Sequence, residues 1–188
     1  MLAYLFWHVP LADTDKGNYE TALTDFHRHL ANDPPQGFRC SATYRISKVP
    51  WLNDRAGYED WCLVDSAAAL DGLNRAAIKP ERWEVHAGIS YKTDFGHGGL
   101  YYPLHGESHP LEGSKVVWLK RPRRIRYEAP LREIIDASRG VLSCWRKLMV
   151  LGPAPEFAVI GDASLDVRTP PDWQVLSVTR ENLLTADL

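Results

Sequence analysis

Five side chains that could bind a ligand or move protons fall on predicted β-strands. They are a histidine, an arginine, a glutamate, a tryptophan and a tyrosine: His8, Arg45, Glu59, Trp61 and Tyr101. A histidine exchanges protons near neutral pH, and an arginine can hold a carboxylate or enolate oxygen. Small-molecule sites are usually built from a few such polar groups among aromatic rings. We therefore predict that His8 is an acid–base catalyst and Arg45 an anion clamp, and that the other three contact the ligand.

The same strand residues also have a purely structural interpretation. Arg45 and Glu59 would form an ion pair between neighbouring strands, and Trp61 would pack between two sheets. The protein would then be a non-catalytic structural or interaction protein, with its 7 Trp, 8 Tyr and 5 Phe used in packing and oligomer contacts. The two hypotheses differ in one respect: an enzyme needs an open pocket that holds His8 or Arg45, whereas an interaction protein would have a filled cleft.

A third hypothesis concerns haem. His86 lies in the segment Trp83-Glu-Val-His86, for which a helix is predicted, and a histidine on a helix can be an axial ligand of haem iron. The sequence offers no other haem feature, so packing of the helix explains His86 better.

Other metal-ligating residues concentrate near the middle of the chain: His97, His105, Glu107 and His109. Imidazole and carboxylate groups bind zinc or iron. However, residues 105–114 have the turn-forming content of a linker, and Gly96–Gly99 is typical of a turn. His27 and His29 are two residues apart on a predicted helix, so they point in different directions and are assigned to the surface. We therefore predict neither a metal site nor a cofactor.

A basic run places five cations within seven residues: Lys120, Arg121, Arg123, Arg124 and Arg126. Such a run can neutralise phosphates or attract an acidic ligand. Glu128 and Glu133 follow it closely, and the chain as a whole has a net charge of -2, whereas nucleic-acid-binding domains are usually basic. We expect a solvated face with local ion pairs and no nucleic-acid partner.

The composition is that of a folded globular protein, with 45% hydrophobic and 24% charged residues in 188. The sequence contains no phosphate-binding loop, dinucleotide fingerprint or nucleophile elbow. Its three cysteines, Cys40, Cys62 and Cys144, are far apart, which favours a reducing compartment. The apolar segment 2–9 is too short to cross a bilayer and lacks the charge pattern of a signal peptide. We therefore expect a cytoplasmic protein with no membrane partner.

The first half of the chain predicts a β-α-β-β-α-β order. Strands are predicted over 2–9, 38–49, 58–64 and 100–104, and helices over 18–31, 66–79 and 81–93. In the first strand, Tyr4, Phe6 and His8 should face one way, and the residues between them the other way. This order of elements is the ferredoxin-like plan.

The local patterns of the second half repeat those of the first in shortened form. Phe6-Trp7-His8-Val9-Pro10 is echoed by Val117-Trp118-Leu119-Lys120-Arg121-Pro122, and the predicted strand that begins at Cys40 is echoed by one that begins at Cys144. The second helix of the repeat is missing or very short. We therefore predict an α+β protein of two tandem ferredoxin-like units, residues 1–104 and 115–188, joined by the linker 105–114.

Two such units in tandem resemble the dimeric α/β-barrel superfamily in its fused form. The resemblance implies two antiparallel sheets packed face to face, with helices outside and a cleft between the sheets. The superfamily includes cofactor-free monooxygenases, isomerases and haem-binding chlorite-dismutase-like proteins. Its antibiotic monooxygenases use an Asn on the first strand, which segment 2–9 lacks. The phrases Tyr58–Val64 and Met149–Phe157 resemble those of uncharacterised bacterial proteins.

These observations together predict a protein that binds a small organic molecule in an inter-sheet cleft. Its reaction would be a cofactor-free proton transfer or the oxygenation of an aromatic or carboxylated compound. Open strand edges would also allow a homodimer.

Overall fold

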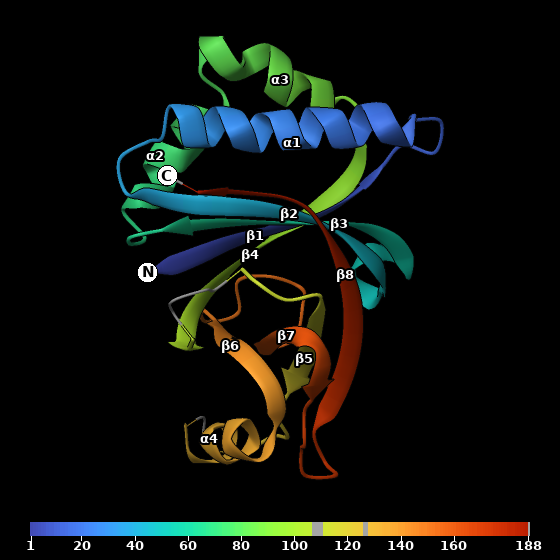
Figure 1. The fold of residues 1–188 in the computed structure, drawn as a ribbon, viewed down its shortest axis with the longest axis vertical. Helices are drawn as coiled ribbons and strands as arrows, with labels where there is room; N and C mark the ends of the chain where they lie inside the picture. Colours follow the sequence, from blue (N-terminus) through green and yellow to red (C-terminus); the bar gives the residue numbers. More distant parts are fainter. Residues whose placement is uncertain (107–110, 126–127, 188) are drawn as a thin grey trace.

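Eight antiparallel strands close into one barrel in the computed structural model, which describes residues 1–106, 111–125 and 128–187 (Figure 1). In chain order the strands are β1 (Leu2–Pro10), β2 (Phe38–Val49), β3 (Arg55–Val64), β4 (Thr93–His105), β5 (Lys115–Lys120), β6 (Arg139–Lys147), β7 (Phe157–Asp166) and β8 (Gln174–Asp187). Around the barrel they follow the order β1-β3-β2-β8-β5-β7-β6-β4.

Four helices lie outside the barrel: α1 (Lys16–Asn32), α2 (Ala69–Ala77), α3 (Pro80–Ser90) and α4 (Glu128–Ala137). The first three lie together on the side formed by β1 to β4, and α4 lies at the opposite end of the molecule (Figure 1). A short 3-10 turn, η1 (Pro50–Leu52), connects β2 to β3. None of the described helices is long and apolar enough to span a membrane.

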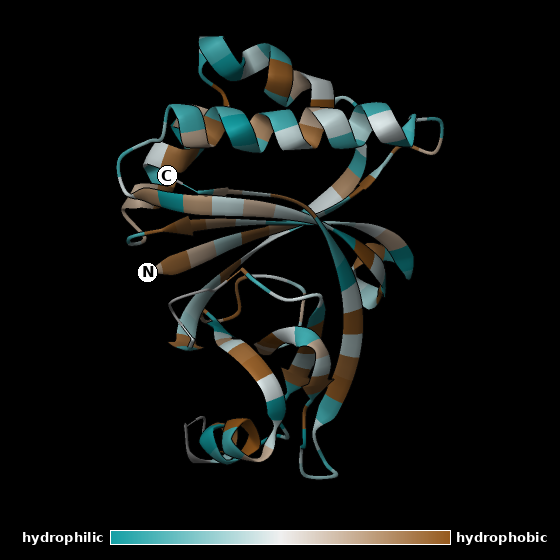
Figure 2. Cartoon of the chain, in the orientation of Figure 1, coloured by the Kyte–Doolittle hydropathy of each residue, from teal (hydrophilic) through white to brown (hydrophobic). Residues whose placement is uncertain are grey.

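The predicted helix over 18–31 is confirmed as α1, and local chemistry explains its limits. Asp15 caps its first turn by accepting a hydrogen bond from the Asn18 backbone nitrogen at 2.8 Å. The helix ends before the sequence Asp33-Pro-Pro, because proline disfavours helical geometry in the preceding residue. Along α1, hydrophilic and hydrophobic residues alternate (Figure 2), as expected for a helix with one buried face.

The expectation of two tandem ferredoxin-like units with sheets packed face to face is wrong. β2 pairs with β8 between Cys40–Ile46 and Arg180–Asp187, and β4 pairs with β6. These two ladders join the strands of residues 2–105 to those of residues 115–187 in one closed barrel, so the ferredoxin-like description and the internal repeat are not supported. Closure satisfies the backbone groups that open sheet edges would leave unpaired.

The interior of the barrel is filled with side chains, four of them fully buried indoles: Trp7, Trp61, Trp118 and Trp145. The rings of Trp7 and Trp118 are 5.6 Å apart, and those of Trp61 and Trp145 are 5.4 Å apart, each pair edge to face. The alternation predicted for the first strand is confirmed, since Trp7 points into the barrel and Tyr4 packs on the helix side. The space where a cleft between sheets was expected is therefore occupied by packed indoles.

Candidate active site

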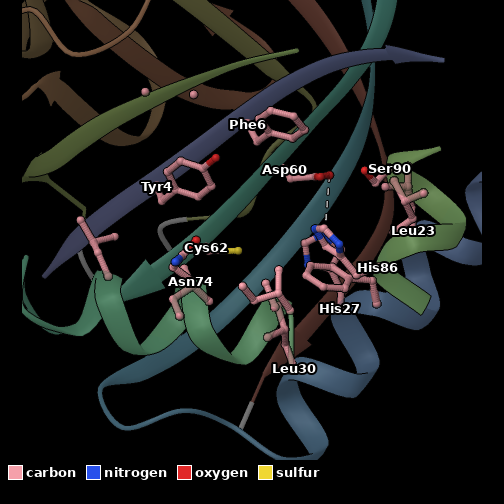
Figure 3. Close-up of a pocket in the computed structure, with 18 of the residues that line it drawn as sticks. Tyr4, Phe6, Leu23, His27, Leu30, Asp60, Cys62, Asn74, His86 and Ser90 are labelled. Atoms are coloured by element: carbon pink, nitrogen blue, oxygen red, sulfur yellow. Dashed lines mark ion pairs between the residues drawn. The ribbon is translucent and has the colours of Figure 1, made fainter. Parts of the chain in front are cut away.

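A pocket of about 700 Å³ lies on the outer face of the barrel, between β1, β3 and β4 and the helices α1, α2 and α3 (Figure 3). This volume is in the range of small-molecule sites. Apolar side chains form most of its walls: Tyr4, Phe6, Leu23, Phe26, Leu30, Leu70, Leu73 and Leu100. Its main polar side chains are His27, Asp60, Asn74 and His86.

Glycines in β4 make room for the aromatic rings of this wall. A Cβ atom on Gly96 would lie 2.5 Å from the Phe6 ring, which real contacts do not allow. The segment Gly96–Gly99 is thus not the predicted turn but part of β4, paired with β1. In the loop after β6, Gly152 has a φ of 122° and lies against the backbone of Gly99.

One carboxylate in this region lies between two histidines. The Asp60 Oδ2 atom is 3.1 Å from His8 Nε2, and the Oδ1 atom is 3.5 Å from His27 Nε2 (Figure 3 shows the contact with His27). Both imidazoles are fully buried, and the Asp60 side chain is 13% exposed. Burial alone would raise the pKa of Asp60, but the two histidines outweigh it and hold that pKa well below its usual range. Asp60 is therefore ionised.

A chain of hydrogen bonds continues from His8 away from the pocket. His8 Nδ1 is 2.7 Å from the Tyr19 hydroxyl, which is 2.8 Å from the Thr93 hydroxyl. Burial raises the pKa of Tyr19, so this phenol keeps its proton. While Thr93 donates to the Ile89 carbonyl, it can only accept from Tyr19. His8 thus bridges two groups, with Nδ1 toward the Tyr19 hydroxyl and Nε2 toward the Asp60 carboxylate.

His86 on α3 differs from these two histidines because its ring has no hydrogen-bond partner among the described residues. Its ring packs on that of Phe26, at 5.9 Å between centroids, and it lies beside His27 in the pocket wall (Figure 3). Burial lowers the pKa of His86, so its imidazole is neutral at pH 7. A neutral imidazole with a free nitrogen can accept a proton from a bound molecule.

The charge of the pocket wall restricts what it can bind. Its described residues include the carboxylate of Asp60 but neither lysine nor arginine. An anionic ligand would therefore meet a negative charge with no cation to offset it. The same feature weighs against haem at His86, because haem propionates would find no basic partner in this wall.

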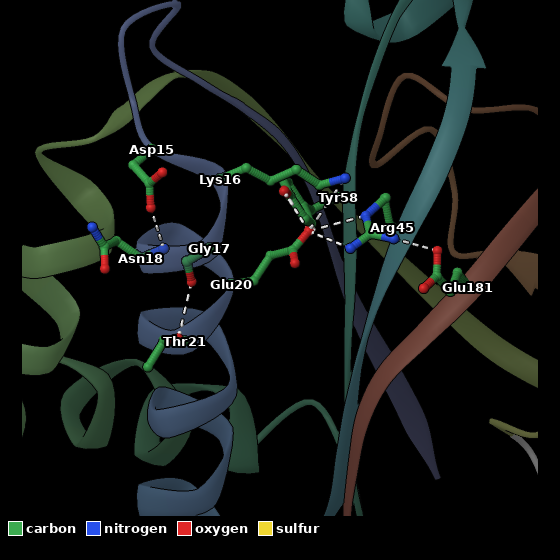
Figure 4. A network of polar contacts seen from close by, with 9 residues as sticks. All are labelled: Asp15, Lys16, Gly17, Asn18, Glu20, Thr21, Arg45, Tyr58 and Glu181. Atoms are coloured by element: carbon green, nitrogen blue, oxygen red, sulfur yellow. Dashed lines mark hydrogen bonds and ion pairs between the residues drawn. The ribbon is translucent and has the colours of Figure 1, made fainter.

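The two predicted catalytic residues lie outside the pocket lining. His8 is on the helix side of β1, fully buried behind Asp60. Arg45 lies on β2 and forms ion pairs with Glu20 of α1, at 2.7 Å, and with Glu181 of β8 (Figure 4). Glu20 also accepts a hydrogen bond from the Tyr58 hydroxyl at 3.0 Å. The alternative pair between Arg45 and Glu59 does not form, because these residues lie on opposite sides of the barrel wall.

The three predicted ligand contacts, Glu59, Trp61 and Tyr101, are fully buried in the barrel interior. Glu59 accepts hydrogen bonds from the indole nitrogens of Trp7, at 2.7 Å, and Trp61, at 2.8 Å. Tyr101 donates to the Pro155 carbonyl at 2.8 Å. The pocket on the helix side uses none of the three, and their contact with a ligand stays a prediction.

The residues that sequence reasoning missed are His27 and Asp60. His27 was expected on the surface, yet it is fully buried and its Nδ1 atom lies 2.8 Å from the Ser41 hydroxyl. A usable signal existed: His27 follows Leu23 by four residues and precedes Leu30 by three, so it belongs to the same helix face. Asp60 alternates with two inward-facing neighbours on β3, which places it on the helix side.

The structure describes only part of two other clusters found in the sequence, the histidine-rich metal-ligand candidates and the basic run. The residues that the structure describes contain no group of three or more potential metal ligands. Glu107 and His109 of the predicted histidine-rich cluster lie outside the described residues, as does Arg126 of the basic run.

No family model and no curated protein matches the sequence. Solved structures of similar fold include an anthrone oxidase-like protein, with 10% identity and a TM-score of 0.55 over 99% of this chain and 92% of that one. A provisionally assigned monooxygenase from Lactobacillus acidophilus NCFM has 7% identity and a TM-score of 0.56, covering 99% and 96% of the two chains. Another, from Fusobacterium nucleatum subsp. nucleatum ATCC 25586, has 9% identity and a TM-score of 0.60, covering 99% and 94%. At these identities the likeness shows a shared α+β barrel fold.

Proposed function

We propose that this protein oxygenates an uncharged aromatic compound in the pocket between the barrel and its helices, without a cofactor. The observation that carries the proposal is the neutral, unpartnered imidazole of His86 in a wall made largely of aromatic and aliphatic side chains. The fold shared with an anthrone oxidase-like protein and with provisionally assigned monooxygenases supports the same reaction class.

The pocket favours a flat, apolar substrate. Tyr4 and Phe6 from β1 and Phe26 from α1 offer ring surfaces on two sides of it. The ionised Asp60 disfavours a carboxylated ligand, so of the two substrate classes expected from the sequence we retain the aromatic one. Burial raises the pKa of Tyr4 to about 12, which leaves its hydroxyl protonated and able to donate a hydrogen bond to a substrate carbonyl.

The chemistry begins with loss of a proton from an activated methylene carbon, such as the one between the two rings of an anthrone. His86 accepts that proton, and O2 adds to the resulting carbanion to form, after protonation, a hydroperoxide. Loss of water from the hydroperoxide leaves a carbonyl group. One atom of O2 enters the product and the other leaves as water, and all the electrons that reduce O2 come from the substrate carbon.

In this scheme Asp60 takes no part in the reaction and helps to hold the His27 ring in place. The Asp60 carboxylate faces the Nε2 atom of His27 at 3.5 Å, and the Ser41 hydroxyl contacts the opposite nitrogen at 2.8 Å. We assign both as positioning residues: they hold His27 against the wall where His86 and the substrate meet. His86 alone is assigned as the proton acceptor, because its ring is the one without a competing partner.

The test measures O2 uptake and quinone absorbance with anthrone, after subtraction of the spontaneous oxidation in buffer. The wild-type protein should accelerate quinone formation, and His86→Gln should lose at least about 100-fold of that acceleration, a typical contribution of a general base. His29→Gln, an exposed position on α1, is the matched control and should keep full activity.

Thermal unfolding of His86→Gln must remain close to wild type for the comparison to hold. Equal rates in wild type and His86→Gln would refute the role of His86. Anthrone that binds, as seen by a thermal shift, but is never oxidised faster than in buffer would refute the oxygenase and leave a binding protein.

A further inference from the structure

A second cavity opens at one end of the barrel, where η1, the end of β5 and the start of β8 meet. Its volume is about 940 Å³, and it shares no lining residue with the pocket described above. Barrel mouths are a frequent place for ligand sites. Its lining includes residues 120–124 of the basic run. From the end of β6 and the loop after it come Lys147, Met149, Val150 and residues 153–156.

Positive charge dominates the lining of this cleft. Five cations line it, Lys120, Arg121, Arg123, Arg124 and Lys147, against a single carboxylate, Glu156. The whole chain by contrast has a net charge of -2. Charge of one sign in a concave site raises the local concentration of ligands of opposite sign.

Three of these cations have no ion pair or hydrogen bond within the described part of the chain: Lys120, Arg123 and Arg124. Glu156 is already engaged by Arg121, at 3.0 Å. The Lys147 ammonium donates to the backbone carbonyls of Gly152, at 2.9 Å, and Ala154, at 2.5 Å. The local ion pairs expected from the sequence therefore account for Arg121 but leave three charges available.

Indole rings line the same cleft. Trp51 and Trp118 pack edge to face with ring centroids 5.4 Å apart, and both are at least nine-tenths buried. The Nε1 atom of each is buried and has no hydrogen-bond partner. An indole N–H can only donate, so an acceptor oxygen on a ligand would satisfy it. The cleft thus has two unsatisfied indole donors buried in its wall, close to three unpaired cations.

We propose that this cleft binds a small aromatic polyanion, a molecule with a ring and two or more carboxylate or phosphate charges. The ring would lie toward Trp51 and Trp118, and the charges would meet Lys120, Arg123 and Arg124. A single negative charge would leave most of this positive charge unmatched, which is why a polyanion is required. The proposal uses none of the residues of the helix-side pocket, so it stands independently of the proposed function.

Calorimetric titration with three probes tests the proposal: trimesate, naphthyl phosphate and benzoate. Trimesate, naphthyl phosphate or both should bind, and which one does so distinguishes a carboxylate from a phosphate ligand. Benzoate, with one charge, should bind at least about tenfold more weakly, as expected for the loss of one charge-assisted hydrogen bond. Raising the salt concentration should weaken binding of the polyanion.

The decisive variant is Arg123→Gln/Arg124→Asn, which removes two charges and places asparagine at the position where φ is 72°. It should weaken binding at least about tenfold. Arg28→Gln/Arg132→Gln removes the same charge from exposed positions outside the cleft and should leave binding unchanged. Equal losses in both double variants, or no binding of either polyanion to the intact protein, would overturn the proposal.

Discussion

Replacing Asp60 by asparagine keeps the size of the side chain and removes its charge. In the native structure its carboxylate contacts His8 at 3.1 Å and His27 at 3.5 Å. An asparagine has one acceptor oxygen and one NH2 group, so it can satisfy at most one of the two histidines as they now stand. The other histidine, fully buried, would face a donor instead of an acceptor.

The expected cost follows from these contacts. A hydrogen bond to a charged group contributes about 1.5–3 kcal/mol. The 3.1 Å contact with His8 counts in full, and the longer contact with His27 counts for less. Asp60→Asn should therefore lower the free energy of unfolding by about 2–3 kcal/mol at pH 7.

Urea denaturation at pH 7, followed by circular dichroism, measures this cost. The matched control is Asp25→Asn, which removes the carboxylate of an exposed pair with Arg28. Exposed pairs contribute about 0–1 kcal/mol. If Asp60→Asn costs no more than Asp25→Asn, the arrangement of Asp60 between two histidines does not stabilise the fold as argued.

Two further predictions concern the proposed base and the loop at the pocket wall. Because burial lowers the pKa of His86, kcat/KM for anthrone should stay constant above the ordinary histidine pKa of 6.5 and fall only below it, a decline that His86→Gln should not show; a decline centred above pH 7 would contradict the assignment. Gly152→Ala should lower the melting temperature, since its Cβ would lie 2.8 Å from the Gly99 Cα atom at a φ of 122°. Gly88→Ala on α3 meets nothing within 4 Å and should instead stabilise the protein by about 0.5–1 kcal/mol; a loss in both variants would refute the steric argument.

The local part of the fold was predictable because it depends on short-range pattern. The strand over 38–49 and the alternation of Tyr4 and Trp7 across β1 follow from side-chain periodicity. Barrel closure was not predictable in the same way, since it depends on β2 meeting β8 across more than a hundred residues. Periodicity assigns the two faces of a strand, but it does not say which edge finds which partner.

The candidate site was harder to predict than the fold for a related reason. Asp60, His27 and His86 come from β3, α1 and α3, and only packing brings them together. The prediction chose Glu59 and Trp61 on the same strand, one residue away on either side of Asp60. Those two residues lie on the face of β3 that fills the barrel, whereas Asp60 lies on the face that lines the helix-side pocket.

The adjacent carboxylates of Glu59 and Asp60 should consequently respond to pH in opposite directions. Burial raises the pKa of Glu59, so between its unfolded value of 4.5 and the higher native value the folded state holds a proton that the unfolded chain has lost. Stability from Glu59 therefore falls as pH rises above 4.5. Two histidines lower the pKa of Asp60, so its contribution is complete above its unfolded value of 3.8 and is lost as pH falls below it.

Urea titrations between pH 3 and pH 7 separate the two behaviours. The difference in unfolding free energy between wild type and Asp60→Asn should grow as pH rises through the acidic part of this range. The difference between wild type and Glu59→Gln should shrink as pH rises above 4.5. If both differences in unfolding free energy changed with pH in the same direction, the two faces of β3 would not shift the pKa values of Glu59 and Asp60 in opposite directions. Glu59 is buried against two indoles with the Arg180 guanidinium 3.7 Å away, and its burial outweighs that cation, whereas Asp60 lies between imidazoles. The opposite slopes therefore test the assignment of faces without any ligand or assay of activity.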